Sequence, residues 1–210
     1  MRRAWLTVEF LLLFFGVVGA YAALGRPSSP IPPLLLLGLV ALLWLRRRPG
    51  FDRGNLLRPA GLHEALPTIL ITWAVAAVAG IVVVAVVEPA ELFDLPRTQT
   101  LLWVLIIVLY PLLSVYPQEL IYRAFLLHRY EPILGRGRLA AAASAAAFGF
   151  AYIIFGAVAS VLLTLAGGWL FARRYQRTRS LLAASVEHAL YGVLAFTIGL
   201  GDLFYHGAVR

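Results

Sequence analysis

Apolar runs, several of them close to 20 residues long, constrain the fold of this chain more than any other feature. A helix needs about 20 mostly apolar residues to cross the hydrocarbon core of a bilayer. The 210 residues are 61% hydrophobic and 13% charged, whereas soluble domains are about 45–50% apolar. The sequence therefore predicts an all-α fold, a polytopic transmembrane helix bundle that forms a single integral membrane domain over residues 1–210.

About seven membrane spans are expected. They lie at roughly 4–25, 31–45, 67–88, 99–127, 139–156, 157–173 and 180–199. The fourth run contains Pro111 and Pro117, and proline removes a backbone donor from the helix interior. We therefore expect a kink or a local break in that helix.

Small residues are concentrated in two places, the alanine-rich segment 139–147 and the Leu165–Gly168 segment. Small side chains let helix backbones approach one another closely in lipid. Both segments therefore predict tight helix packing, which could also serve to position a polar site.

All 18 basic residues are arginines, and they cluster between the apolar runs, giving a net charge of +8. With the N-terminus inside, fifteen arginines fall in inside segments, and only Arg26, Arg97 and Arg210 fall outside. This bias is the positive-inside pattern. We expect an integral protein of a bacterial or archaeal cell membrane, with a cytoplasmic N-terminus and the C-terminus outside. The expected partners are membrane lipids with acidic headgroups. We do not expect the arginines to bind nucleic acid.

The first apolar run resembles a secretory signal peptide, because Arg2 and Arg3 precede it and Ala20-Tyr21-Ala22 follows it. Glu9 interrupts the run, and further spans come after it. We therefore expect an uncleaved first helix.

Charged and polar residues inside the apolar runs are the candidate functional residues. Glu119 and Arg123 are four apart and share one helix face, next to Gln118. A charge at mid-membrane is costly unless it is paired or hydrated, so it indicates either a functional site or a structural ion pair. The chain has no cysteine, which excludes a thiolate nucleophile and a cysteine-type metal site.

His188 lies inside the last apolar run, at a depth similar to that of Glu119. At about 1.5 Å per residue, His188 is about 13 Å from Arg179 and Glu119 about 15 Å from Arg129. A buried site requires such convergence, as does a buried structural hydrogen bond. We expect the two residues to meet at the floor of a cavity open to the cytoplasmic side.

Three short motifs resemble those of the CPBP family, the CAAX prenyl protease and bacteriocin-processing membrane proteins. Gln118-Glu119-x-x-x-Arg123 resembles the first motif, Glu-Glu-x-x-x-Arg. The segment from Phe148 to Tyr152 resembles the second, Phe-x-x-x-His, and His188 with Gly192 resembles the third, His-x-x-x-Asn. The resemblance covers about residues 99–200.

The resemblance implies an all-helical bundle with a buried hydrolytic site that cuts membrane-associated or prenylated proteins or peptides. Glu119 would act as the base and His188 would polarise the carbonyl, while Arg123 would keep Glu119 ionised. Gln118 and Tyr152 would donate hydrogen bonds. A divalent metal such as zinc would have Glu119 and His188 as ligands, although a catalytic zinc typically has three protein ligands.

Three positions depart from the family motifs. Gln118 stands where the family has its water-activating Glu, Tyr152 where it has His, and Gly192 where it has Asn. A glutamine amide cannot act as a general base. The sequence therefore leaves three functions open: an intramembrane endopeptidase, a non-catalytic member that binds a lipidated peptide or membrane protein partner, and a transporter whose polar residues line a path.

Overall fold

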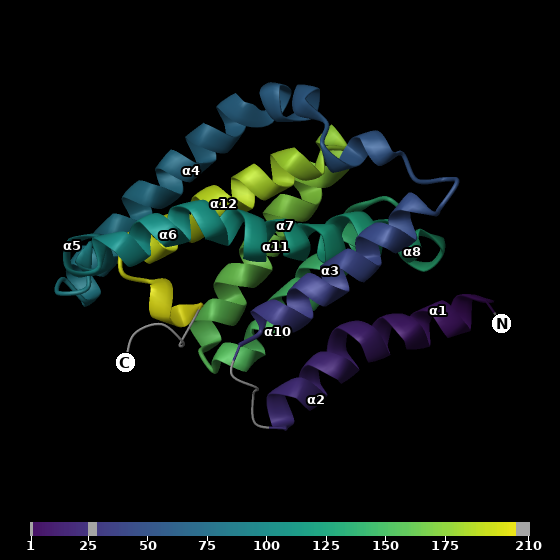
Figure 1. Cartoon of the computed structure of the whole chain (residues 1–210), viewed down its shortest axis with the longest axis horizontal. Coiled ribbons are helices and arrows are strands. Elements are labelled where there is room, and N and C mark those ends of the chain that lie inside the picture. Colours follow the sequence, from purple (N-terminus) through teal and green to yellow (C-terminus); the bar gives the residue numbers. More distant parts are fainter. Residues whose placement is uncertain (1, 25–28, 205–210) are drawn as a thin grey trace.

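The computed structural model describes residues 2–24 and 29–204, and every regular element in these residues is a helix (Figure 1). In chain order they are α1 (Arg2–Leu11), η1 (Leu12–Gly16), α2 (Val17–Ala23), α3 (Ile31–Arg46), η2 (Arg53–Leu56), α4 (Pro59–Val87), α5 (Asp94–Thr98), α6 (Thr100–Tyr110), η3 (Pro111–Val115), α7 (Tyr116–Glu119), η4 (Leu120–Phe125), α8 (Leu126–Arg129), α9 (Glu131–Leu134), α10 (Arg138–Ala151), η5 (Tyr152–Phe155), α11 (Val158–Thr178), α12 (Leu181–Thr197) and η6 (Gly201–Leu203). The predicted all-α class is confirmed.

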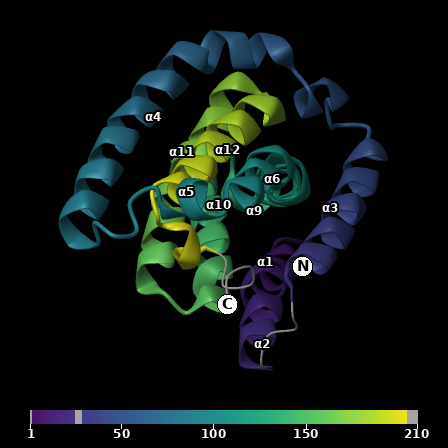
Figure 2. The same cartoon turned by 60° about the vertical axis from the view of Figure 1, so that its left-hand side comes forward.

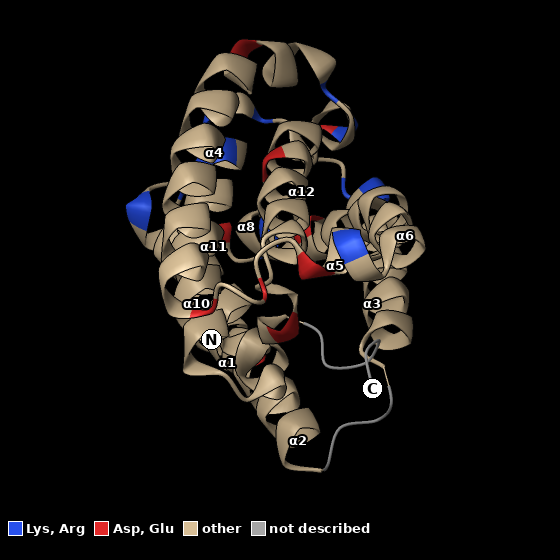
Figure 3. Cartoon of the chain, turned by 90° about the vertical axis from the view of Figure 1, so that its left-hand side faces the viewer, with Lys and Arg blue, Asp and Glu red and all other residues tan. Residues whose placement is uncertain are grey.

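Four helical segments are long and apolar enough to cross a membrane: Arg3–Ala23, Arg53–Val87, Thr100–Arg129 and Arg138–Phe155. Two shorter apolar helices, Ile31–Arg46 and Leu181–Thr197, accompany them. Long stretches of these helices carry no charged residue (Figure 3). Each of the seven predicted runs is thus largely helical, while their number as membrane spans remains a prediction.

Two predicted boundaries differ from the observed helices. The third run was expected to begin at residue 67, but α4 begins at Pro59, whose fixed φ suits the first helical position. Pro67 therefore lies inside the helix. The sixth run was expected to end at 173, but α11 continues through its arginine-rich last turns to Thr178, and Arg179 follows with a φ of 51°.

The helix that carries Glu119 remains helical from Thr100 to Arg129 but widens twice. Its backbone forms π-helical turns at η3, which begins at Pro111, and at η4, which contains Arg123. A π turn accommodates one extra residue in the helix and occurs often at functional sites. The irregularity expected from Pro111 and Pro117 is present as these turns, without a break in the helix.

Figure 2 shows the rod formed by α6 to α8 nearly end-on, with α12 on one side and α3 on the other, and α4 outermost. Two indole hydrogen bonds tie α12 to its neighbours. Trp73 Nε1 on α4 donates to Leu190 O at 3.0 Å, and Trp103 Nε1 on α6 donates to Thr197 Oγ1 at 3.0 Å. These bonds help to fix the helix that carries His188.

The α10 and α11 helices pack closely through small residues, as predicted. A Cβ atom added at Gly168 would lie 3.1 Å from Ala145 Cα, and one added at Gly149 would lie 2.5 Å from Leu165 Cγ. Close approach of this kind lets α10 present Ser144 and Phe148 to the centre of the bundle, where both are buried.

The first helix is joined to α8 by a polar cluster that the sequence analysis did not anticipate. Arg129 donates to both carboxylate oxygens of Glu9, at 2.9 and 2.7 Å, and Tyr130 Oη donates to Glu9 at 3.0 Å. Phe10 and Phe14 pack against Tyr130 in the same cluster. Glu9, which interrupts the first apolar run, thereby connects that run to the helix carrying Glu119.

Candidate functional site

The Glu119 carboxylate and the Arg123 guanidinium form a fully buried ion pair. Arg123 Nε donates to Glu119 Oε2 at 3.1 Å, and both side chains have 0% exposure. Arg123 Nη1 also donates to Ser144 Oγ at 2.6 Å, and Ser144 Oγ donates to the Tyr122 carbonyl at 2.7 Å. The i,i+4 spacing places both groups on one helix face, and α10 supplies Ser144 as a further acceptor.

His188 on α12 meets the other oxygen of Glu119. His188 Nδ1 lies 2.9 Å from Glu119 Oε1, and the histidine is 4% exposed. Because an ionised carboxylate only accepts hydrogen bonds, this contact assigns the proton to Nδ1. The structure thus brings together the two residues whose similar depth suggested a common site.

Tyr110 completes this network, and the sequence analysis missed it. Its hydroxyl lies 3.4 Å from His188 Nε2 and is the group placed to donate to it. A Cβ atom added at Gly192 would overlap the Tyr110 ring and hydroxyl. Tyr110 therefore occupies the space beside Gly192, where the family motif has Asn. A tyrosine within the apolar run 99–127 gave no signal of this role.

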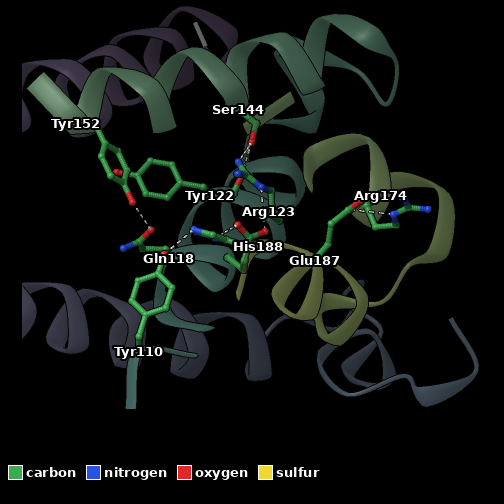
Figure 4. Close-up of polar contacts among 10 residues, drawn as sticks. Tyr110, Gln118, Tyr122, Arg123, Ser144, Tyr152, Arg174, Glu187 and His188 are labelled. Atoms are coloured by element: carbon green, nitrogen blue, oxygen red, sulfur yellow. Dashed lines mark hydrogen bonds and ion pairs between the residues drawn. The ribbon is translucent and has the colours of Figure 1, made fainter. Parts of the chain in front are cut away.

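Gln118 and Tyr152 form a second polar contact, shown in Figure 4 beside the first. Tyr152 Oη donates to Gln118 Oε1 at 3.2 Å, and Gln118 Nε2 donates to Ser114 Oγ at 2.8 Å. The two positions that depart from the family's catalytic residues therefore contact each other. Both side chains are neutral, so this contact is an amide–phenol hydrogen bond.

Aromatic side chains enclose the charged groups. The Phe171 ring stacks on His188 with centroids 4.6 Å apart, and Phe148 meets His188 edge-on at 5.4 Å. Arg123 Cζ lies 4.9 Å from the Phe148 centroid, within the range of a cation–π contact. Phe148, the first residue of the second motif, thus packs against both Arg123 and His188.

A second buried ion pair lies next to His188 in sequence. Glu187 has 0% side-chain exposure and receives two hydrogen bonds from Arg174, both at 2.9 Å. Arg174 Nη1 also donates to Thr68 Oγ1 on α4 at 3.0 Å. This pair joins α4, α11 and α12. Glu187 lies in an apolar run like His188, and that feature could have identified it.

An apolar cavity of about 520 Å³ adjoins the neutral part of the site. Tyr110, Gln118 and Tyr152 line it, together with aliphatic residues of α2, α3 and α6. It continues towards Pro30, at the end of α3 remote from Arg46. We expected the cavity to open towards the arginine-rich side, but it does not lead there. A core cluster containing Leu45, Leu120 and Tyr175 fills that side of the site.

The donor set does not fit a catalytic zinc ion. Glu119 directs one oxygen to Arg123 and the other to His188, and His188 Nε2 faces Tyr110. Within residues 2–24 and 29–204, His, Cys, Asp and Glu side chains nowhere form a group of three that could hold a metal. Gln118 and Tyr152 stand where further ligands would be required, and a neutral amide and phenol are weak substitutes for carboxylate and imidazole.

The site can therefore orient and hydrogen-bond a polar group more readily than it can activate water. Gln118 and Tyr152 face the cavity with groups that both donate and accept hydrogen bonds. Glu119, the only carboxylate of the first motif, is buried behind them with both oxygens occupied. The side chains that face the cavity are therefore neutral, and the charged side chains are paired with one another behind them.

These features fit an integral membrane protein, a helical bundle with buried ion pairs at the centre of its apolar helices. The family model described as type II CAAX prenyl endopeptidase Rce1-like matches residues 98–194. This match supports the resemblance to the CPBP family that the three motifs indicated. The match contains every position of those motifs and suggests a CAAX-endopeptidase-like function. Comparisons with curated proteins and with solved structures found no match.

Proposed function

We propose that this chain is a non-catalytic CPBP member that binds the lipid-bearing end of a peptide or membrane protein without cleaving it. The observation that carries the proposal is the state of Glu119, whose two carboxylate oxygens are held by Arg123 and His188 away from the cavity. A general base must reach the proton that it abstracts. Glu119 reaches two protein donors instead.

The cavity suits a ligand with an apolar chain and a polar amide end. Apolar side chains such as Leu34, Leu105 and Leu109 form most of its wall, and Gln118 and Tyr152 form its polar end. Its volume of about 520 Å³ falls within the usual range of ligand pockets, about 300–1,000 Å³. An isoprenoid chain would lie against the leucines, and a peptide amide would bond to Gln118 and Tyr152.

A second candidate is a slow intramembrane endopeptidase in which Glu119 is the base and His188 polarises the scissile carbonyl. The 2.9 Å contact between Glu119 and His188 favours it, because the two groups are already aligned. Arg123 would hold Glu119 ionised, and Gln118 and Tyr152 would orient the substrate. This function requires the Glu119 carboxylate to be released towards the cavity.

We further propose that residues 1–210 form one integral membrane domain of seven spans in a bacterial or archaeal cell membrane. The N-terminus would be cytoplasmic and the C-terminus outside. The arginine bias supports this topology, as does the arrangement of two segments far apart in sequence. Gly50–Arg58 and Gln176–Arg179 contribute residues to one polar cavity, so both segments lie at the same end of the bundle.

The binding proposal is tested with a fluorescent peptide carrying a thioether-linked farnesyl chain, added to the full-length protein in nanodiscs. Ala151→Trp would fill the cavity that Ala151 lines. Ala142→Trp places the same side chain on the exposed surface of the same helix and serves as control. We expect Ala151→Trp to weaken binding about tenfold or more, a free-energy loss of about 1.4 kcal/mol or greater.

The same peptide without its farnesyl chain should bind weakly to the wild type. Its affinity should be no higher than that of the farnesylated peptide for Ala151→Trp. Equal affinities for the two peptides, or equal effects of the two tryptophans, would show that the cavity does not hold the chain.

A further inference from the structure

A second, polar cavity of about 570 Å³ lies at the arginine-rich end of the bundle, separate from the apolar one. Its wall comes from the segment between α3 and α4, from the α8–α9 region, and from the beginning of α10 and the end of α11. The charged residues in its wall are Asp52, Arg58, Glu131, Arg136 and Arg179.

The charges of this cavity leave one arginine unpaired. Arg58 pairs with Asp52, and Arg136 Nε donates to Glu131 at 2.7 Å. Arg179 is exposed and makes no ion pair with any described residue. Because each carboxylate already has a partner, the wall carries a surplus positive charge, which favours an anionic ligand.

The start of α10 adds to the positive character. Gly135 and Ala140 both line the cavity, so the first turn of this 14-residue helix borders it. Among the described residues, no side chain caps that end of the helix. Uncapped backbone N–H groups and the helix dipole favour a phosphate or another anion at such a position.

The cavity wall also contains a buried amide with unused hydrogen-bonding capacity. Asn55 is 7% exposed, and its Oδ1 has no hydrogen-bond partner among the described residues. A buried unsatisfied acceptor is costly. A ligand that carries hydroxyl groups as well as an anion would supply the missing donor once the cavity adjusts around it.

Aromatic rings place this cavity at the depth of lipid headgroups. His128 lines the cavity and lies edge-on to Phe51, with centroids 5.3 Å apart, and to Trp44, at 6.1 Å. Arg48 Cζ lies 4.3 Å from the Trp44 centroid. Tryptophan with flanking arginine is typical of the membrane–water interface.

We propose that this polar cavity binds the phosphodiester headgroup of an anionic phospholipid that bears hydroxyl groups, such as phosphatidylglycerol. Arg179, Arg136 and Arg58 contact the phosphate, and the neighbouring polar side chains bond to the hydroxyls. The site is distinct from the apolar cavity and does not depend on the function proposed for it.

The test uses native mass spectrometry of the full-length protein, with phosphatidylglycerol and phosphatidylcholine of identical acyl chains present in equal amounts. Arg179→Gln and Arg136→Gln each remove one cation from the wall. Arg177→Gln removes the same charge from an exposed position two residues away that does not line the cavity. The wild type and Arg177→Gln should retain one phosphatidylglycerol in preference to phosphatidylcholine. The double variant Arg136→Gln/Arg179→Gln should weaken that retention about tenfold, as expected for two lost charge-assisted hydrogen bonds.

Free glycerol 3-phosphate, added as competitor, distinguishes a lipid headgroup from a soluble phosphate ester as the ligand of this cavity. Failure of the competitor to displace phosphatidylglycerol would support the lipid. Binding of glycerol 3-phosphate that Arg179→Gln weakens, without preference between the two lipids, would instead assign the cavity to a soluble phosphate ester. Equal retention of the two lipids, or equal effects of Arg177→Gln and Arg179→Gln, would overturn the proposal.

Discussion

The two oxygens of Glu119 explain why Gln118, Glu119 and Arg123 occur together in an apolar sequence. One oxygen accepts from Arg123 and the other from His188, so the carboxylate stays paired without water. Burying a carboxylate without such partners would cost several kcal/mol. Gln118, one residue further round the helix, is left to face the cavity as a neutral group.

Arg123→Ala should destabilise the protein strongly, because it leaves Glu119 buried with one unpaired oxygen. In soluble proteins the loss of one partner from a buried pair costs about 3–5 kcal/mol. Thermal unfolding in detergent should show a large fall in midpoint or no folded protein at all. Arg177→Ala, which removes an exposed arginine, should unfold like the wild type. An unchanged midpoint for Arg123→Ala would mean that the pair contributes no stability.

Gly192→Asn should be destabilising on its own, although it restores the residue of the family motif. A side chain at 192 overlaps the Tyr110 ring, and overpacking of this kind typically costs about 1–3 kcal/mol. Tyr110→Ala removes the obstructing ring, so the double variant should recover stability relative to the sum of the single changes. Additive effects in this double-mutant cycle, measured by thermal unfolding, would show that the two positions do not compete for space.

At the scale of helices, the lengths of the apolar runs and the proline positions were enough to predict seven helical segments and the irregular fourth one. They could not predict the start of α4 at Pro59, because the first turns of this helix carry His63 and Glu64 and so interrupt the apolar run. The similar depths estimated for Glu119 and His188 along their helices predicted that the two residues meet. This estimate could not find Tyr110 or Ser144, which are uncharged, or the pairing of Glu9 with Arg129, since this pairing depends on where the first helix packs.

Gly149→Ala tests the close packing of α10 on α11. The added methyl group would lie 2.5 Å from Leu165 Cγ, so we expect a loss of about 1–3 kcal/mol in unfolding free energy. Gly137→Ala is the control, because a Cβ atom there would have no neighbour within 4 Å. Unfolding in detergent should separate the two variants. If Gly149→Ala is as stable as Gly137→Ala, the helices do not approach as closely as described.

At the scale of the whole molecule, the topology predicts the side of the membrane on which each connection lies. Reporter fusions after residues 48, 95 and 177 should report inside, outside and inside. The fusions after residues 48 and 177 should report the same side, because the segments next to them line the same polar cavity at the arginine-rich end. An outside signal at 177 would contradict both the arginine bias and this packing.

A site that binds a peptide without hydrolysing it is tested most directly by following the fate of a bound substrate. A membrane-tethered farnesylated peptide is incubated with the wild type in nanodiscs and analysed by mass spectrometry. As a comparison, Gln118→Glu/Tyr152→His restores the missing carboxylate and imidazole at two positions that already touch, and it should raise cleavage above the wild-type level. We predict that the wild type binds the peptide and returns it intact. Time-dependent cleavage by the wild type, abolished in folded Glu119→Gln, would contradict the claim and establish the endopeptidase instead.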